Sequence, residues 1–216
     1  MLVTSLVPTP QREAFAFENA LADVKAEGPS VKPGPKPTLG LQKNGDLLPC
    51  LDGKPHCFST VSVVGEKPVD TAKIGRDWIV MQWSYKGKSV AGALLDIKSA
   101  VEAYPPGQSG IDAGGFKIAS IKVPNSMDDP GYLYAQFEAR AGYIDDMEFL
   151  ARNGIVQVRT SSRVGYLDSG VNAKRFNYFA KALGSFKGWT TSKIVLNEHL
   201  EYFDLNELAS NKDVGL

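Results

Sequence analysis

The segment "DDMEFLARNGIVQVRTS" at residues 145–161 decides the fold of this chain. Asn153 and Gly154 in its centre predict a two-residue hairpin turn, because both central residues of a type I′ turn need a positive φ. Counting outward from such a turn places Glu148 of one strand opposite Arg159 of the other. The sequence therefore predicts an antiparallel hairpin with a fixed register.

This hairpin is predicted to have one apolar and one polar face, because successive side chains of a strand point to opposite sides. The apolar face holds Met147, Phe149, Val156 and Val158, and the polar face holds Asp146, Glu148, Arg159 and Ser161. The polar face is either an active site or a lattice of ion pairs that joins the sheet to its neighbours. We favour the lattice, because charged groups in a packed network perturb one another without reacting.

The rest of the chain beyond residue 46 alternates between strands and a few amphipathic helices. Further strands are predicted at residues 57–65, 77–85, 116–123, 132–140 and 189–196. Helices are predicted at residues 89–106, 171–184 and 197–209, the first capped by Ser89 and the second by Asp168 or Ser169. Successive strands joined by short turns predict an α+β fold, an antiparallel meander with two or three helices packed on one face.

The first 45 residues are expected to form an extended N-terminal arm with a short helix at residues 11–26, ahead of a single domain at residues 46–216. Residues 28–45 contain four prolines, four glycines and three lysines, with no acidic residue. That composition favours an extended, polyproline-like chain. Either a partner surface orders this segment, or it packs along its own domain.

Charge and hydropathy exclude two classes of protein. Lys plus Arg equals Asp plus Glu at 24 each, so no excess of positive charge is present to neutralise a nucleic-acid backbone. The sequence contains no run of about 18 apolar residues, so we expect no transmembrane segment.

The two cysteines lie close together in "PCLDGKPHCF". Gly53 and Pro55 between them can turn the chain back, so Cys50 and Cys57 are predicted to form a disulfide. The chain-entropy model gives such a short loop about 2.5 kcal/mol of stabilisation, and the bond persists only in an oxidising compartment. The alternatives are a zinc site with His56 and two free thiols, but zinc prefers four ligands. We expect no metal site and no cofactor.

Several of these segments together resemble the family called domain of unknown function 1499. The resemblance covers roughly residues 47–185 and rests on "PCLDGKPHCFST", "YLYAQFEAR", "IDDMEFL" and "VQVRTSSRVGYLDSGVNAKR". His56 stands where the family usually has asparagine. Ala173 and Lys174 replace part of an Asn-Arg-x-Arg helix start, which removes one positive charge and weakens the case for an anion site.

The resemblance implies a set of motif residues but no reaction. The motif carries over to Asp145, Asp146, Glu148, Arg159, Ser161, Arg163, Tyr166, Asp168 and Asn172. Members of the family occur in bacteria and photosynthetic eukaryotes, and many carry export or plastid signals. The implied location is the thylakoid lumen of a plastid, or alternatively a bacterial periplasm.

We expect a non-catalytic accessory or assembly subunit bound peripherally to a membrane protein complex, a photosystem or its antenna, through the N-terminal arm. The alternative is an enzyme or small-anion-binding domain that uses Asp146, Glu148, Arg159 and Arg163. The sequence favours the non-catalytic interpretation without deciding it. Lipid or pigment binding is a third possibility and would require an apolar pocket.

Overall fold

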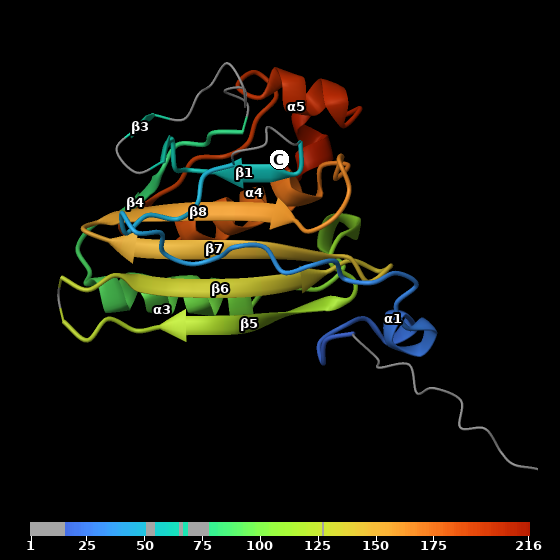
Figure 1. Ribbon diagram of the computed structural model, residues 1–216, viewed down its shortest axis with the longest axis horizontal. Helices are drawn as coiled ribbons and strands as arrows, with labels where there is room; N and C mark the ends of the chain where they lie inside the picture. The colour runs from blue at the N-terminus through green and yellow to red at the C-terminus, as the bar shows by residue number, and fades with distance from the viewer. Residues whose placement is uncertain (1–15, 51–54, 65–66, 69–77, 127) are drawn as a thin grey trace, which may run out of the picture.

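The chain folds as an α+β domain built on one antiparallel sheet of seven strands (Figure 1). The structure is a computed structural model that describes residues 16–50, 55–64, 67–68, 78–126 and 128–216. Among these residues no helix is long and apolar enough to cross a membrane.

Four long strands form the predicted meander. They are β5 (Gly115–Lys122), β6 (Gly131–Glu138), β7 (Ile144–Arg152) and β8 (Ile155–Ser162), and each pairs with the next in the order of the chain. The outer edge of β8 is shared by two short strands, β1 (Cys57–Ser59) and β4 (Trp83–Tyr85), and β9 (Trp189–Thr190) extends the sheet beyond β4. A separate two-stranded ribbon joins β2 (Val63–Val64) to β3 (Lys67–Pro68).

The β7–β8 hairpin has the predicted turn and register. Asn153 and Gly154 have φ angles of 49° and 77°, as the turn requires. Glu148 lies opposite Arg159, and Asp146 opposite Ser161. The pairing therefore divides the sheet into an apolar face and a polar face, as the sequence predicts.

Two helices cover the apolar face, α3 (Val90–Glu102) and α4 (Val171–Gly184). The Ser89 hydroxyl caps α3 by accepting a hydrogen bond from the Gly92 N–H. The helices and sheet enclose one large core, which includes Leu94, Ile97, Phe137, Phe149, Phe176 and Phe179. The C-terminal part adds α5 (Leu200–Leu205) and the short 3-10 helix η2 (Asn211–Val214), and another 3-10 turn, η1 (Gln108–Gly110), follows α3.

The polar face is covered by residues 29–47, which we call the strap. Figure 1 shows this blue segment crossing in front of β6, β7 and β8, while α3 and α4 lie behind them. Leu47 of the strap is buried in a second, smaller core that also contains Val61, Tyr132, Tyr134 and Leu150. In its described part, the extended segment thus packs along its own domain, the second of the two explanations offered for its order.

The strap is preceded by a short turn and by α1 (Ala22–Glu27), which lie beside the start of β5. The N–H groups of Phe17 and Leu21 donate to the carbonyl oxygens of Gly114 and Ala113. Asn19 Oδ1 accepts from the Phe116 N–H. A Cβ at Gly115, which has a φ of 88°, would lie 2.3 Å from this amide oxygen, so only glycine allows the approach.

The predicted helix at residues 11–26 is confirmed at residues 22–26 and is wrong at residues 16–21. Residues 16–21 form a turn, and the helix begins only at Ala22. The physical reason is that Asn19 hydrogen-bonds to the sheet edge instead of continuing a helix. Residues 11–15 lie outside the described part.

Three predicted strands and one helix are shorter than expected. In its described part, residues 78–85, the predicted strand is reduced to β4, which pairs with β8 only at Ile155 and Val156 because β1 pairs with β8 at Arg159–Ser161. Residue 77 lies outside the described residues. The strand at 57–65 is divided between β1 and β2 over residues 57–64, and residue 65 lies outside the described part. The helix α5 occupies only part of residues 197–209. The strand at 189–196 ends at Thr190, and the Ile194 N–H donates instead to the Asn177 side chain.

Candidate functional site

The motif residues lie on both faces of the sheet, so they form two networks instead of one cluster. Strand alternation places Asp146, Glu148 and Arg159 under the strap, whereas Asp145 points to the helices. The first network therefore joins the sheet to the strap, and the second joins it to α4.

In the strap-side network, Asp146 is fully buried and bound by three donor groups. Arg163 donates from Nε to Oδ2 and from Nη2 to Oδ1, each at 2.8 Å. The Tyr134 hydroxyl donates to Oδ1 at 2.5 Å. Hydrogen bonds between a guanidinium and a carboxylate are shorter and stronger than those between neutral groups. Asp146 thus anchors Arg163, at the end of β8, to β6 and β7.

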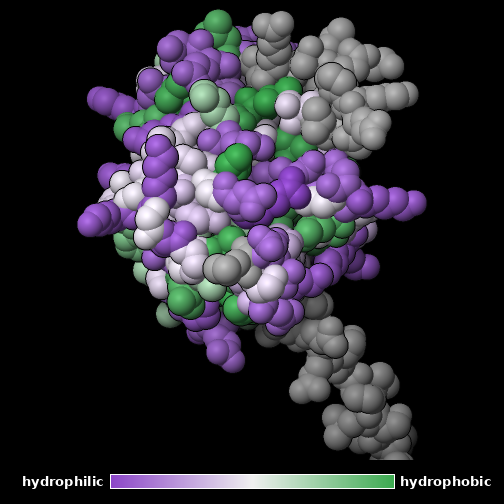
Figure 2. Space-filling model, turned by 90° about the vertical axis from the view of Figure 1, so that its left-hand side faces the viewer, coloured by the Kyte–Doolittle hydropathy of each residue, from purple (hydrophilic) through white to green (hydrophobic). Residues whose placement is uncertain are grey.

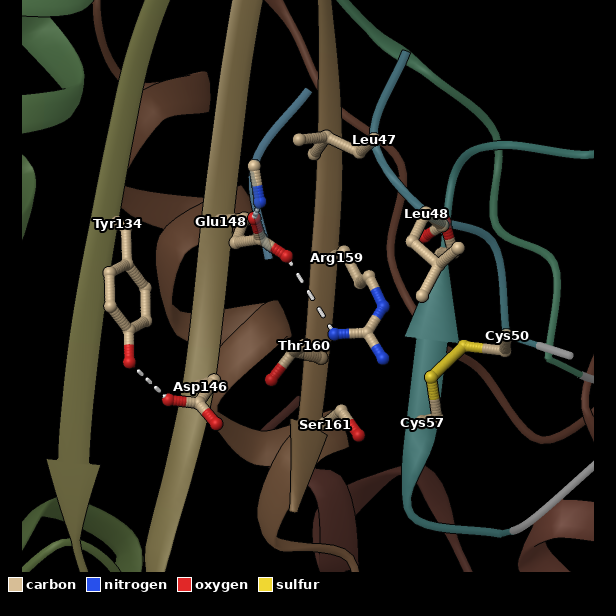
Figure 3. A network of polar contacts seen from close by, with 12 residues as sticks. Leu47, Leu48, Cys50, Cys57, Tyr134, Asp146, Glu148, Arg159, Thr160 and Ser161 are labelled. Atoms are coloured by element: carbon tan, nitrogen blue, oxygen red, sulfur yellow. Dashed lines mark hydrogen bonds and ion pairs between the residues drawn. A yellow bond between two sulfur atoms is a disulfide. The ribbon is translucent and has the colours of Figure 1, made fainter. Parts of the chain in front are cut away.

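Glu148 is also fully buried, but its two oxygens differ (Figure 3). Oε1 accepts from the Gly40 N–H of the strap at 2.6 Å and from the Tyr132 hydroxyl at 2.7 Å. Oε2 lies 3.7 Å from Nη1 of Arg159, too far for a hydrogen bond. Burial raises the pKa of Glu148 above its usual range, against the opposing effect of these hydrogen bonds and of Arg159.

Arg159 is the least satisfied group of this network. Its side chain is 7% exposed, and its Nε and Nη1 atoms are buried without a hydrogen bond to any described residue. It lies in register between Glu148 on β7 and Ser59 on β1. The predicted cross-strand pair therefore exists as a charge contact only.

In the helix-side network, Arg175 of α4 is completely buried between two carboxylates. It donates to Asp112 from Nε at 2.9 Å and from Nη2 at 2.5 Å, and Nη2 also donates to Asp145 at 2.8 Å. Tyr104 adds a hydroxyl donor to Asp112 at 2.5 Å. Burial raises the pKa of Asp112, but the two-point contact with a guanidinium favours the ionised carboxylate.

Asn172 and Asp168 connect the start of α4 to the end of β8. The Asn172 amide donates to Ser162 Oγ and to Asp168 Oδ2, and its Oδ1 accepts from the Thr160 hydroxyl. Asp168 accepts from the N–H groups of Gly170 and Asn172 and from the Tyr202 hydroxyl. Asp168 therefore accepts from the first turn of α4, whose N-cap position is Gly170, and burial raises the pKa of Asp168.

The two remaining motif residues are outside these networks. The Ser161 hydroxyl donates to the backbone oxygen of Ser162 at 3.3 Å, so its partner is a carbonyl group and not a base. Tyr166 is exposed to solvent on the loop before α4. A nucleophilic hydroxyl would need a base within hydrogen-bond reach.

The residues that sequence reasoning missed are Asp112, Arg175, Tyr132 and Tyr134. Asp112 lies in a glycine-rich stretch that reads as a loop, and its contact with Arg175 joins residues 63 positions apart. The tyrosines on alternate positions of β6 were a usable signal, because residues two apart on a strand share a face.

The predicted disulfide is confirmed. Cys50, just after the strap, is bonded to Cys57 at the start of β1, and Figure 3 shows it beside Arg159. This bond removes the zinc alternative, because both thiols are used. The described residues contain no group of three or more histidine, cysteine or acidic side chains that could hold a metal.

Comparison with known proteins gives a family but no function. A family model described as "Protein of unknown function (DUF1499)" matches residues 46–183. No curated protein and no solved structure matches the chain.

Proposed function

The chain belongs to the DUF1499 family, and we propose that it is a non-catalytic accessory or assembly subunit that binds peripherally to a membrane protein complex. The observation that carries the proposal is the use of the motif side chains within the fold. Asp146, Asp168 and Asn172 are each held by several internal hydrogen bonds. Groups committed to such bonds stabilise a rigid surface and are poorly placed for proton transfer.

The disulfide supports an oxidising compartment as the site of action, because reducing conditions would open it. The thylakoid lumen is the compartment that we propose, with a photosystem or its antenna as the complex. A bacterial periplasm is the alternative. The proposal of a plastid compartment rests on the resemblance described above.

The proposed contact surface includes the outer side of the strap. Its leucines face the sheet, whereas Lys32, Lys36 and Lys43 are exposed. The single acidic residue of the strap, Asp46, is paired with Arg152. The three ammonium groups therefore suit an acidic partner surface. The strap would thus contact the complex through its lysines while remaining bound to its own sheet.

Association of the full chain with washed thylakoid membranes tests this proposal. We expect co-purification with one complex, and a loss of most of the retained protein in the Lys32→Glu, Lys43→Glu double variant. Lys187→Glu, which changes an exposed lysine after α4, is the matched control. Equal retention of both variants would show that the strap lysines do not lie at the interface. No retention of the unmodified chain would contradict the proposed function.

Small-anion binding at Arg159 is a second candidate, favoured by its unsatisfied donors. Buried guanidinium groups without hydrogen bonds require a partner such as water or an ion. Thermal unfolding in increasing formate tests it. Formate should raise the unfolding temperature of the unmodified chain but not of Arg159→Gln, with Arg152→Gln as a control at a partly exposed arginine. An equal rise in all three proteins would contradict a site at Arg159.

A further inference from the structure

A hollow of about 530 Å³ lies at the end of the sheet where β8 leads toward α4. Three separate segments form its walls: the turn between β6 and β7, the end of β8, and the loop before α4. The apolar lining consists of Ala139, Tyr143, Val164, Leu167 and Val171. This is the right-hand end of the sheet in Figure 1.

One wall of the hollow is fixed by the strap. A Cβ at Gly34, which has a φ of 79°, would come within 2.4 Å of Val164 Cγ1, so the backbone of the strap packs directly on this side chain. On the neighbouring turn, the N–H groups of Ser30 and Val31 both donate to the Ala141 carbonyl oxygen. The hollow is therefore formed by elements that the strap holds in place.

The polar groups of the lining include two carboxylates, Asp145 and Asp168. The Asp145 side chain is 9% exposed, and its Oδ2 accepts from Arg175. Its Oδ1 accepts no hydrogen bond from any residue that the structure describes. The unpaired oxygen of a nearly buried carboxylate side chain therefore borders the hollow, and a ligand that carries a donor could bind it.

Negative charge exceeds positive charge behind the hollow. Burial raises the pKa of both Asp112 and Asp168, and the nearby charge of Asp145 adds to each of these increases. Arg175 is the guanidinium that binds both Asp112 and Asp145. No lysine, arginine or histidine contributes to the lining. Negative charge in a site with apolar walls attracts cations more strongly than the same charge in open water.

The rim of the hollow carries exposed aromatic and aliphatic side chains. Tyr143 is 44% exposed and Leu167 is 47% exposed, and Tyr166 beside Leu167 is 59% exposed. The opposite end of the sheet, which faces the viewer in Figure 2, has apolar side chains dispersed among hydrophilic ones. Exposed apolar side chains around a depression are typical of protein contact sites, and tyrosine is enriched among the residues that contribute most to binding.

We propose that this hollow is a docking site for a partner segment that carries a lysine or arginine side chain between apolar residues. The cationic head reaches Asp145 and donates to Oδ1, and its methylene chain lies against Val164 and Leu167. Tyr143 adds a ring surface that favours a nearby cation. The inference rests on the proposed function as a binding protein and names one surface and the chemistry of its partner.

Nuclear magnetic resonance titration of the full chain with three short peptides tests the site. The probes are acetyl-Leu-Lys-Leu-amide, its Gln analogue and its Glu analogue. We expect the lysine peptide to shift the amide signals of Tyr143, Leu167 and Ser169, and the Gln peptide to bind more weakly. The Glu peptide should cause no shift there.

Two substitutions of exposed leucines provide the matched comparison. Leu167→Lys places a like charge at the rim and should weaken binding of the lysine peptide about tenfold, whereas Leu95→Lys on α3 should leave it unchanged. Equal binding of the lysine and glutamate peptides, shifts at another surface, or unchanged affinity in Leu167→Lys would overturn the inference. Retention on membranes despite any of these results would leave the proposed function standing.

Discussion

Arg163 binds Asp146 through two hydrogen bonds of 2.8 Å, whereas Arg159 on the same face comes only within 3.7 Å of Glu148. The two pairs share a similar environment, because all four side chains are nearly or completely buried under the strap. They therefore provide an internal comparison of a hydrogen-bonded ion pair with a charge contact.

Double-mutant cycles should separate the two pairs. For Asp146→Asn with Arg163→Gln we expect a coupling energy of about 2–3 kcal/mol, because two charge-assisted hydrogen bonds are lost together. For Glu148→Gln with Arg159→Gln we expect about 0.5–1 kcal/mol. Urea unfolding of each single and double variant measures both values. A larger coupling for Glu148 and Arg159 would show that these side chains form a direct hydrogen bond.

The packing of the strap depends on Leu47, which is 1% exposed. Leu47→Ala should lower the free energy of unfolding by about 2–4 kcal/mol, because it leaves a cavity in the second core. Hydrogen exchange at Gly40, whose N–H is bound to Glu148, should become faster. Leu95→Ala, at an exposed leucine of α3, should change neither quantity. Unchanged exchange at Gly40 in Leu47→Ala would mean that the strap binds independently of this core.

The buried carboxyl group of Glu138 should make the stability of the protein depend on pH. Burial raises the pKa of this carboxyl from 4.5 to about 7, against the Phe17 N–H and the charge of Lys117. Between these values the folded protein keeps a proton that the unfolded chain has lost, so the contribution to stability is present below about pH 4.5 and is lost as the pH rises to about 7.

Glu138→Gln should remove this dependence. The variant should be more stable than the unmodified chain by about 1–3 kcal/mol at pH 8, and the difference should shrink toward pH 4.5. Urea unfolding at three pH values measures it. A constant difference across the range would mean that the carboxyl titrates alike in the folded and unfolded chains.

Reduction of the disulfide between Cys50 and Cys57 should lower the free energy of unfolding by about 2.5 kcal/mol. Urea unfolding with and without a reducing agent measures this change. The Cys50→Ser, Cys57→Ser double variant should be insensitive to the reducing agent. If the reducing agent lowers the free energy of unfolding equally in both proteins, the decrease has a cause other than reduction of this disulfide.

The parts of the fold that could be predicted are those set by neighbouring residues. Asn153 and Gly154 determine a turn, and the turn determines that Glu148 faces Arg159. The two cysteines are separated by seven positions, so their pairing could also be predicted.

The rest of the candidate site depends on contacts between distant residues. Gly40 and Glu148 are 108 positions apart, and no local pattern indicates that a proline-rich segment would cover a polar sheet face. The shortness of β4 has the same kind of cause, since β1 competes for the edge of β8. These outcomes depend on which distant segments compete for the same sheet edge or face, and local secondary-structure propensities carry no information about that competition.

The strap is held at both of its ends, by the hydrogen bonds of Phe17 and Leu21 before β5 and by the disulfide at Cys50. A segment closed in this way leaves the sheet only by bulging, and it returns in a unimolecular step. Its effective concentration over the polar face is set by the length of the loop and not by the amount of protein. A free peptide with the sequence of the strap should therefore compete poorly for this face, and solvent should reach Glu148 only in short openings whose frequency is the same in dilute and concentrated samples.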